Sequence, residues 1–189
     1  MHSFYIYLKT RWNYTPLFFF MYLCIVRSNM KKSSKNRLTI HQQALFPKDT
    51  LFDKIARAVC RSQTLPRKEL YEAWEVAKRI RRVFRGGRIV DLACGHGLVS
   101  QILLLLDDTS PGAVVVDTHI PENAEVLSQA LIRTWPRLEN RVLFKQMPLE
   151  QVEISAQDIV VSVHACGALT DAVIEKALSA RAKIAVLPC

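Results

Sequence analysis

Residues 88–106 constrain the fold of this chain more than any other stretch, and they read Arg-Ile-Val-Asp-Leu-Ala-Cys-Gly-His-Gly-Leu-Val-Ser-Gln-Ile-Leu-Leu-Leu-Leu. The apolar start of the stretch predicts a buried strand, and the apolar run at its end predicts a helix. Between them stand Gly95 and Gly97, which adopt positive φ easily and let a ligand approach the backbone. A strand, a glycine turn and a helix in this order are typical of a site that binds a nucleotide-like cofactor.

A second predicted strand, 113–117, ends in Asp117, twenty residues after Gly97. A carboxylate at the carboxyl end of a strand can accept two hydrogen bonds from the vicinal hydroxyls of a ribose. The turn lacks the third glycine of a dinucleotide fingerprint, because position 100 is Ser100. Asp91, at the end of the first strand, would repel a pyrophosphate but suits a ligand that carries an ammonium and a sulfonium. The pattern therefore favours a positively charged adenosine-type ligand over a dinucleotide.

The segment Asp91-Leu-Ala-Cys-Gly-His-Gly97 resembles the first motif of class I S-adenosylmethionine (SAM)-dependent methyltransferases, and it departs from that motif at Ala93, where the family often has glycine. The resemblance implies SAM as the cofactor, with Asp91 either contacting its amino group or ordering the turn. It also places Gln146 at the adenine edge and Met147 on the adenine face. The residues expected to bind the cofactor are Asp91, Ala93, Cys94, Gly95, Gly97, Asp117, Gln146 and Met147.

A second resemblance lies in the run Ser-Val-His-Ala-Cys-Gly-Ala-Leu-Thr-Asp at 162–171. It is similar to the fourth motif of a methyltransferase group that includes some RNA-modifying enzymes, among them tRNA ribose 2′-O-methyltransferases. The resemblance implies that His164 faces the methyl group, as general base or as a residue that orients the acceptor. We expect Thr170 to cap the next helix and Asp171 to lie in its first turn. A zinc site formed by His164, Cys166 and Cys189 is a weaker alternative, so no metal is expected.

The second half of the chain alternates strand and helix, which predicts an α/β, Rossmann-like, mostly parallel sheet preceded by an N-terminal helical lobe. On the expected helix 67–85, Trp74 belongs to the apolar face and is expected to pack. Arg81 projects into that face, where its stem could snorkel to solvent or its guanidinium could pair with a carboxylate. The resembling family has seven strands, and only five are visible here. We therefore expect a sheet that is truncated after its fifth strand, with 183–187 as an unpaired edge. The expected strands are 88–93, 112–117, 141–145, 158–164 and 183–187, and the expected helices are 49–62, 67–85, 97–106, 121–135 and 170–181.

Charge divides the chain into three parts. Residues 1–47 hold seven basic and no acidic residues, residues 48–87 form the expected helical lobe, and residues 88–189 form the expected SAM-binding domain. From 48 to 88 there are twelve basic residues against five acidic ones, whereas 89–189 hold seven against twelve. A basic lobe beside an acidic cofactor domain favours a polyanionic partner, and RNA bound through residues 78–88 is one hypothesis. Solvated helix faces would give the same pattern.

The N-terminal segment contains an apolar run, Leu17–Val26, that is too short to cross a bilayer. Arg27 follows this run directly and no small-residue cleavage site is present, so we expect neither a signal peptide nor stable membrane insertion. Residues 1–29 are expected to contribute nothing to the fold. The five cysteines form no CxxC pair, which argues against a disulfide framework and favours a reducing, cytoplasmic location.

Together these features predict a SAM-dependent methyltransferase whose acceptor and oligomeric state the sequence does not identify. The expected loss of the last strand pair leaves a second hypothesis open, a SAM-binding module or truncated fragment without activity. A nucleotide-dependent oxidoreductase is third, since Ser100 replaces the glycine that such an enzyme would need.

Overall fold

The computed structural model describes residues 3–7, 21–22, 36–163 and 165–187. Its centre is a parallel sheet, as predicted, and the order of the strands in it is β5-β4-β3-β6-β7. The strands are β3 (Ile89–Leu92), β4 (Ala113–Asp117), β5 (Val142–Gln146), β6 (Ile159–Val163) and β7 (Lys183–Leu187). The chain order reverses between β3 and β6, and ligands of open α/β sheets bind near such a switch point, at the carboxyl ends of the strands.

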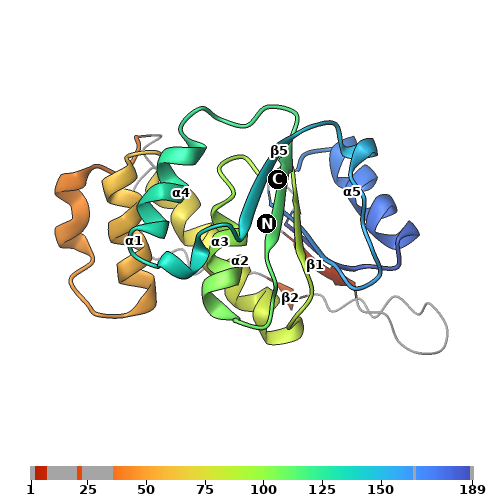
Figure 1. The fold of residues 1–189 in the computed structure, drawn as a ribbon, viewed down its shortest axis with the longest axis horizontal. Helices are drawn as coiled ribbons and strands as arrows, with labels where there is room; N and C mark the ends of the chain where they lie inside the picture. The colour runs from red at the N-terminus through yellow and green to blue at the C-terminus, as the bar shows by residue number, and fades with distance from the viewer. Residues whose placement is uncertain (1–2, 8–20, 23–35, 164, 188–189) are drawn as a thin grey trace.

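Helices cover the two faces of the sheet unequally (Figure 1). One face carries α1 (Leu51–Ser62), α2 (Arg67–Val83), α3 (Leu98–Leu106) and α4 (Ala124–Ile132), and the other carries α5 (Ala168–Ser179). Three short 3₁₀ segments, η1 (Ile40–Leu45), η2 (Pro136–Leu138) and η3 (Leu149–Gln151), lie in the connections. The five parallel strands and five helices were all predicted to within three residues at each end, because their apolar periodicity is strong.

Alternate residues of β3, β4, β6 and β7 supply two separate cores. In β3, Ile89 joins the core under α1 to α4, whereas Val90 and Leu92 join the core under α5. This alternation is the period of two that a strand imposes on its side chains. Both faces are apolar, which is why these strands read as continuous hydrophobic runs.

The edge at β7 is where the prediction was wrong. Strand β1 (Ser3–Tyr7) pairs antiparallel with β7, in the register Tyr5↔Val186, and β2 (Met21–Tyr22) pairs with β1. The sheet therefore has seven strands in the described residues, and the backbone groups of β7 meet a partner on both sides. Residues 3–7 thus contribute to the fold, contrary to the expectation for 1–29. The rest of the apolar run apart from 21–22 lies outside the described residues, and no helix among those described is long and apolar enough to cross a bilayer.

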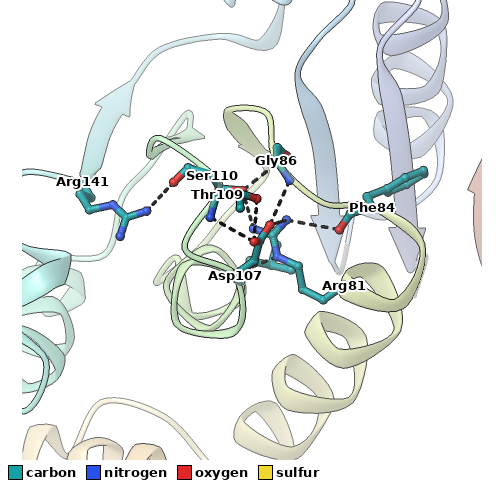
Figure 2. A network of polar contacts seen from close by, with 8 residues as sticks. Arg81, Phe84, Gly86, Asp107, Thr109, Ser110 and Arg141 are labelled. Atoms are coloured by element: carbon teal, nitrogen blue, oxygen red, sulfur yellow. Dashed lines mark hydrogen bonds and ion pairs between the residues drawn. The ribbon is translucent and has the colours of Figure 1, made fainter.

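A buried ion pair joins the end of α2 to the end of α3 (Figure 2). Of the two alternatives for Arg81, the structure shows the carboxylate partner: the side chain is 3% exposed, and its Nη1 lies 3.2 Å from Asp107 Oδ2. The guanidinium also donates to Leu103 O and to Ser110 Oγ. Asp107 in turn accepts hydrogen bonds from Gly86 N and from Thr109 N and Oγ1. This network fixes the amino end of β3 relative to the helices before and after it.

Candidate active site

The turn after β3 has three residues in the left-handed region: Ala93, Gly95 and Gly97, with φ of 56°, 51° and 67°. Ala93 pays a steric cost there that glycine would not, so its conformation explains why the resembling motif often has glycine at this position. A Cβ built on Gly95 meets nothing within 4 Å, which leaves open space above that peptide for a ligand. A Cβ on Gly97 would lie 3.2 Å from the Phe144 ring, so close packing requires this glycine.

Asp117 lies at the carboxyl end of β4 and faces the same turn. Its Oδ2 accepts a hydrogen bond of 3.0 Å from Gly95 N, and its Oδ1 accepts one of 3.2 Å from His119 N. Oδ1 also accepts a long hydrogen bond of 3.5 Å from Thr118 Oγ1. The side chain is half-buried, and Oδ2 keeps a lone pair for a further donor. The structure therefore brings Asp117 and the glycine turn together, as the sequence predicted.

Asp91 lies beneath the turn and is 2% exposed. Its Oδ2 accepts a hydrogen bond of 2.7 Å from Ser100 Oγ on α3, so Ser100 holds the strand to the helix. Burial raises the pKa of the Asp91 carboxyl to about 7, and the nearby charge of Asp117 adds to this, against the lowering effect of Ser100. The geometry favours the second of the two roles considered for Asp91, ordering the turn.

A pocket opens at the carboxyl ends of β3 and β4, on the α5 side of the sheet. Its lining includes the expected Ala93, Asp117 and Met147, and Met147 N also donates to Asp117 O. Gln146, expected at the adenine edge, is an exposed residue of β5 that is not in the lining. The lining residues are Leu92, Ala93, Val116, Asp117, Thr118, Met147, Leu149, Leu169 and Val173. One end of the pocket is thus polar and its walls are aliphatic.

The sequence interpretation missed six of these lining residues: Leu92, Val116, Thr118, Leu149, Leu169 and Val173. Thr118 directly follows Asp117, whose carboxylate is expected to bind the ribose, and Leu149 lies two residues after Met147. Their positions in the sequence could therefore have identified them as lining residues. Leu169 and Val173 are spaced by four residues on α5 and share one helix face. Only the packing of α5 against the sheet shows that this face meets the pocket.

A hydrogen bond that the sequence did not predict links the turn to the start of α4. His96 Nε2 lies 2.9 Å from Asn123 Oδ1, and Asn123 occupies the N-cap position of α4. Together with the bond from Gly95 N to Asp117, it joins the turn to the segment that follows β4.

Cys94 is half-buried inside the turn, and Cys94 N donates to Val116 O. Burial raises the pKa of its thiol, and the charges of Asp91 and Asp117 raise it further. A thiol in such surroundings stays protonated and is a poor nucleophile. Cys94 therefore supports the turn through its backbone.

His164 lies outside the described residues, and so does Cys189, so the catalytic role of the first and the zinc alternative stay predictions. The loop that follows His164 is described. Thr170 does not cap α5 as predicted, because Gly167 takes the N-cap position with φ of 57°. Thr170 Oγ1 instead donates to Ala165 O at 2.7 Å, across this loop, while Asp171 lies in the first turn as expected.

Metal binding receives no support from the described part of the chain, where no group of three or more His, Cys, Asp or Glu side chains could hold an ion. Cys166 is disulfide-bonded, against the expectation that the cysteines stay reduced. Cys60 and Cys94 are free.

Comparison with known protein families supplies the decisive observation, because the model of a family described as "Methyltransferase domain" matches residues 68–189. The chain belongs to this methyltransferase family. The match covers about two thirds of the chain and contains the glycine turn, Asp117 and the pocket. SAM is the cofactor that membership implies. A search of curated proteins found no match.

Several solved structures of methyltransferases are similar to this chain at low identity. A candidate RNA methyltransferase of Pyrococcus horikoshii is 18% identical, with 62% of this chain and 59% of that chain covered and a TM-score of 0.46. An O-methyltransferase family protein of Burkholderia thailandensis is 19% identical, with 78% and 43% covered and a TM-score of 0.45. The Pyrococcus abyssi tRNA (uracil-54, C5)-methyltransferase, solved with S-adenosyl-L-homocysteine, is 15% identical, with 64% and 29% covered and a TM-score of 0.46. The chain spans 59% or less of the length of these three proteins, and these scores are too low to assign an acceptor.

The residues at the site fit SAM. The open space above Gly95 leaves room for the methionine part, and the Asp117 carboxylate, with a free lone pair on Oδ2 and only a long bond from Thr118 to displace on Oδ1, suits the ribose hydroxyls. The aliphatic walls formed by Met147, Leu149 and Leu169 suit a flat adenine ring. No cation forms an ion pair with Asp91 or Asp117 among the described residues, so a sulfonium would meet attraction and no competing charge.

Proposed function

We propose that this chain binds SAM at the carboxyl ends of β3 and β4 and transfers its methyl group to an RNA acceptor. The observation that carries the cofactor part is the convergence of the glycine turn and Asp117 on one pocket with aliphatic walls. Asp117 would hold the ribose, Met147, Leu149 and Leu169 would enclose the adenine, and the peptides of 93–97 would contact the methionine part. Gln146 would at most reach the adenine from outside the pocket.

SAM supplies a methyl group bonded to a positively charged sulfur, and the acceptor atom attacks the methyl carbon in line with the carbon–sulfur bond as the sulfur leaves. The protein's contribution to such a step is mainly to position the two reactants and to exclude water. The turn is prepared for this, because the bonds from Gly95 to Asp117 and from Ser100 to Asp91 fix it without a ligand. His164 is proposed to act on the acceptor side, since the loop after it, held by Thr170, reaches the pocket through Leu169.

RNA is proposed as the acceptor because of the charge distribution. The first 88 residues carry nineteen basic and five acidic side chains, and the fourth-motif resemblance points to the same class. The run 78–88 is less suited to hold RNA than the sequence suggested. Arg79 pairs with Glu75, and Arg88 pairs with Asp158 at the amino end of β3, away from the pocket. Arg82 and Arg85 remain exposed.

The alternative of a SAM-binding module without activity rested on the expected loss of the outer strands. Strands β1 and β2 occupy that edge, so this reason no longer favours it.

The test is transfer of labelled methyl from SAM to purified total RNA, with cell protein as a parallel acceptor. We expect label in RNA with the full chain and much less label with Asp117→Ala, which weakens SAM binding by removing the ribose contact. Label in protein alone would contradict the RNA acceptor. Tight SAM binding without transfer to either fraction would favour the non-catalytic module.

A further inference from the structure

One face of α2 carries two aromatic rings between two cations. Arg67, Tyr71, Trp74 and Lys78 follow one another at intervals of four, three and four residues, so they form one stripe along the helix. The guanidinium carbon of Arg67 lies 5.4 Å from the centre of the Tyr71 ring. Lys78 Nζ lies 5.6 Å from the centre of the Trp74 ring. Each ring therefore has a cation over it.

Both rings are supported from α1. The Phe52 ring lies 5.0 Å from that of Tyr71, at 61°, and 5.3 Å from that of Trp74, at 50°. All three rings are half-buried and pack against the main core. Trp74 thus packs as the sequence predicted, and it is only half-buried. Rings that are already fixed lose little freedom when a partner binds them.

The stripe is positively charged. Helix α2 contains six basic residues and three acidic ones. Glu75 accepts from both Lys78 and Arg79, whereas Arg67 and Arg82 are exposed. A partner that repeats a flat ring and a negative charge matches this alternation of ring and cation, and single-stranded nucleic acid has this chemistry.

We propose that this stripe is a platform on which unpaired bases of the RNA acceptor stack, with their phosphates held by Arg67, Lys78 and Arg82. The proposal rests on the RNA acceptor proposed above. On binding, a base takes the ring face that each cation covers, and the cation moves to the adjacent phosphate. A surface cation–π contact is weak, so base stacking together with a phosphate contact replaces it favourably.

The platform anchors RNA and does not take part in the chemistry. Figure 1 shows α1 and α2 on the side of the sheet opposite α5, whereas α5 supplies Leu169 and Val173 to the pocket. Loss of the platform should therefore raise the KM for RNA and leave the affinity for SAM unchanged.

The experiment measures binding of a labelled single-stranded oligouridylate by fluorescence anisotropy, with the full chain. Stacking on one ring predicts a loss of affinity of at least about fivefold for Trp74→Leu and for Tyr71→Leu. Tyr71→Phe keeps the ring and should bind like the wild type. Trp135→Leu removes a half-buried tryptophan elsewhere in the core and is the matched control. A combined Arg67→Gln and Lys78→Gln variant should lower the slope of log affinity against log salt by about 0.7 for each phosphate that is no longer neutralised.

Wild-type affinity for the oligonucleotide in both Leu variants would overturn the platform, and so would an equal loss in Trp135→Leu. Unchanged SAM affinity shows that each variant is folded. If Trp74→Leu unfolds, the comparison of Tyr71→Leu with Tyr71→Phe still tests the platform. The wild type also has to prefer the single strand to a duplex of the same length, and equal binding overturns stacking. The methyl-transfer assay with total RNA tests the proposed function separately. If the Leu variants methylate RNA as well as the wild type does, the platform is overturned and the proposed function is not.

Discussion

The carboxylates at the two ends of the parallel strands differ in whether they pair with a cation. At the amino end, Asp107 pairs with Arg81 and Asp158 pairs with Arg88. At the carboxyl end, Asp91 and Asp117 lie near each other, and only hydrogen-bond donors contact them in the described structure. The amino end is therefore a closed end, where each of these carboxylates has a cation as its partner. The carboxyl end is an open end, where neither carboxylate has a cation among the described residues and the half-buried Asp117 can contact a ligand.

The pKa directions follow this difference. Burial by itself would raise the pKa of Asp107, but hydrogen bonds from Thr109 and Gly86 and the charge of Arg81 lower it to about 2. Burial also acts to raise the pKa of Asp158, but hydrogen bonds from Arg88 and Ser155 and the charge of Arg88 lower it overall. For Asp91, burial prevails and the pKa rises to about 7. A buried carboxylate without a cation, such as Asp91, lowers the stability of the folded protein, and such local destabilisation is typical of a binding site.

The largest effect is expected at the closed end, from Arg81→Met. This change leaves Asp107 buried without its cation, and removing one partner of a buried ion pair costs about 3–5 kcal/mol. Urea unfolding should show a loss of this size. Arg82→Met, one residue further along α2 and exposed, should change the stability by about 0.5 kcal/mol or less. Similar effects of the two changes would mean that the closed end owes little to its ion pair.

Asp91→Asn tests the open end through pH. Because the folded pKa of Asp91 lies above its unfolded value, the folded protein holds a proton that the unfolded chain releases. Stability should therefore fall between about pH 4 and pH 7, at up to about 1.4 kcal/mol per pH unit, and level off above pH 7. The amide of the variant cannot ionise, so the variant should lack this fall and be the more stable form at pH 8. Parallel stability profiles for the two proteins would show that Asp91 is ionised in the fold.

Asp117→Ala should lower the affinity for SAM by about 2–3 kcal/mol, since the ribose loses two charge-assisted hydrogen bonds. Isothermal titration calorimetry measures this loss. Asp117→Asn retains the shape of the side chain and should fall between the two. Unchanged SAM affinity in a folded Ala variant would place the ribose elsewhere.

The smallest effect is expected from Arg88→Gln. The Arg88 side chain is 40% exposed, so water partly replaces its contact with Asp158, and we expect a loss of about 1 kcal/mol in urea unfolding. SAM affinity should not change, because Arg88 lies at the far end of β3 from the turn. A change in SAM affinity would mean that the two ends of the strand are coupled.

The sequence alone determined the parallel strands, the helices between them and the turn with Asp117. These features depend on local properties: apolar periodicity over ten or more residues, glycines where φ is positive, and a carboxylate at the end of a strand. Asp117 and Gly95 are 22 residues apart, yet their contact was predictable because adjacent parallel strands end at the same edge of the sheet.

Only the tertiary structure decided which side chains border the pocket and which strand covers β7. Leu169 and Val173 meet the site because of how α5 packs, and Gln146 stays outside because β5 presents it to solvent. The pairing of β1 with β7 joins residues about 180 positions apart. Such contacts depend on which surfaces remain unpaired after the rest of the sheet has formed, and the short β1 segment carries no local pattern that specifies its partner.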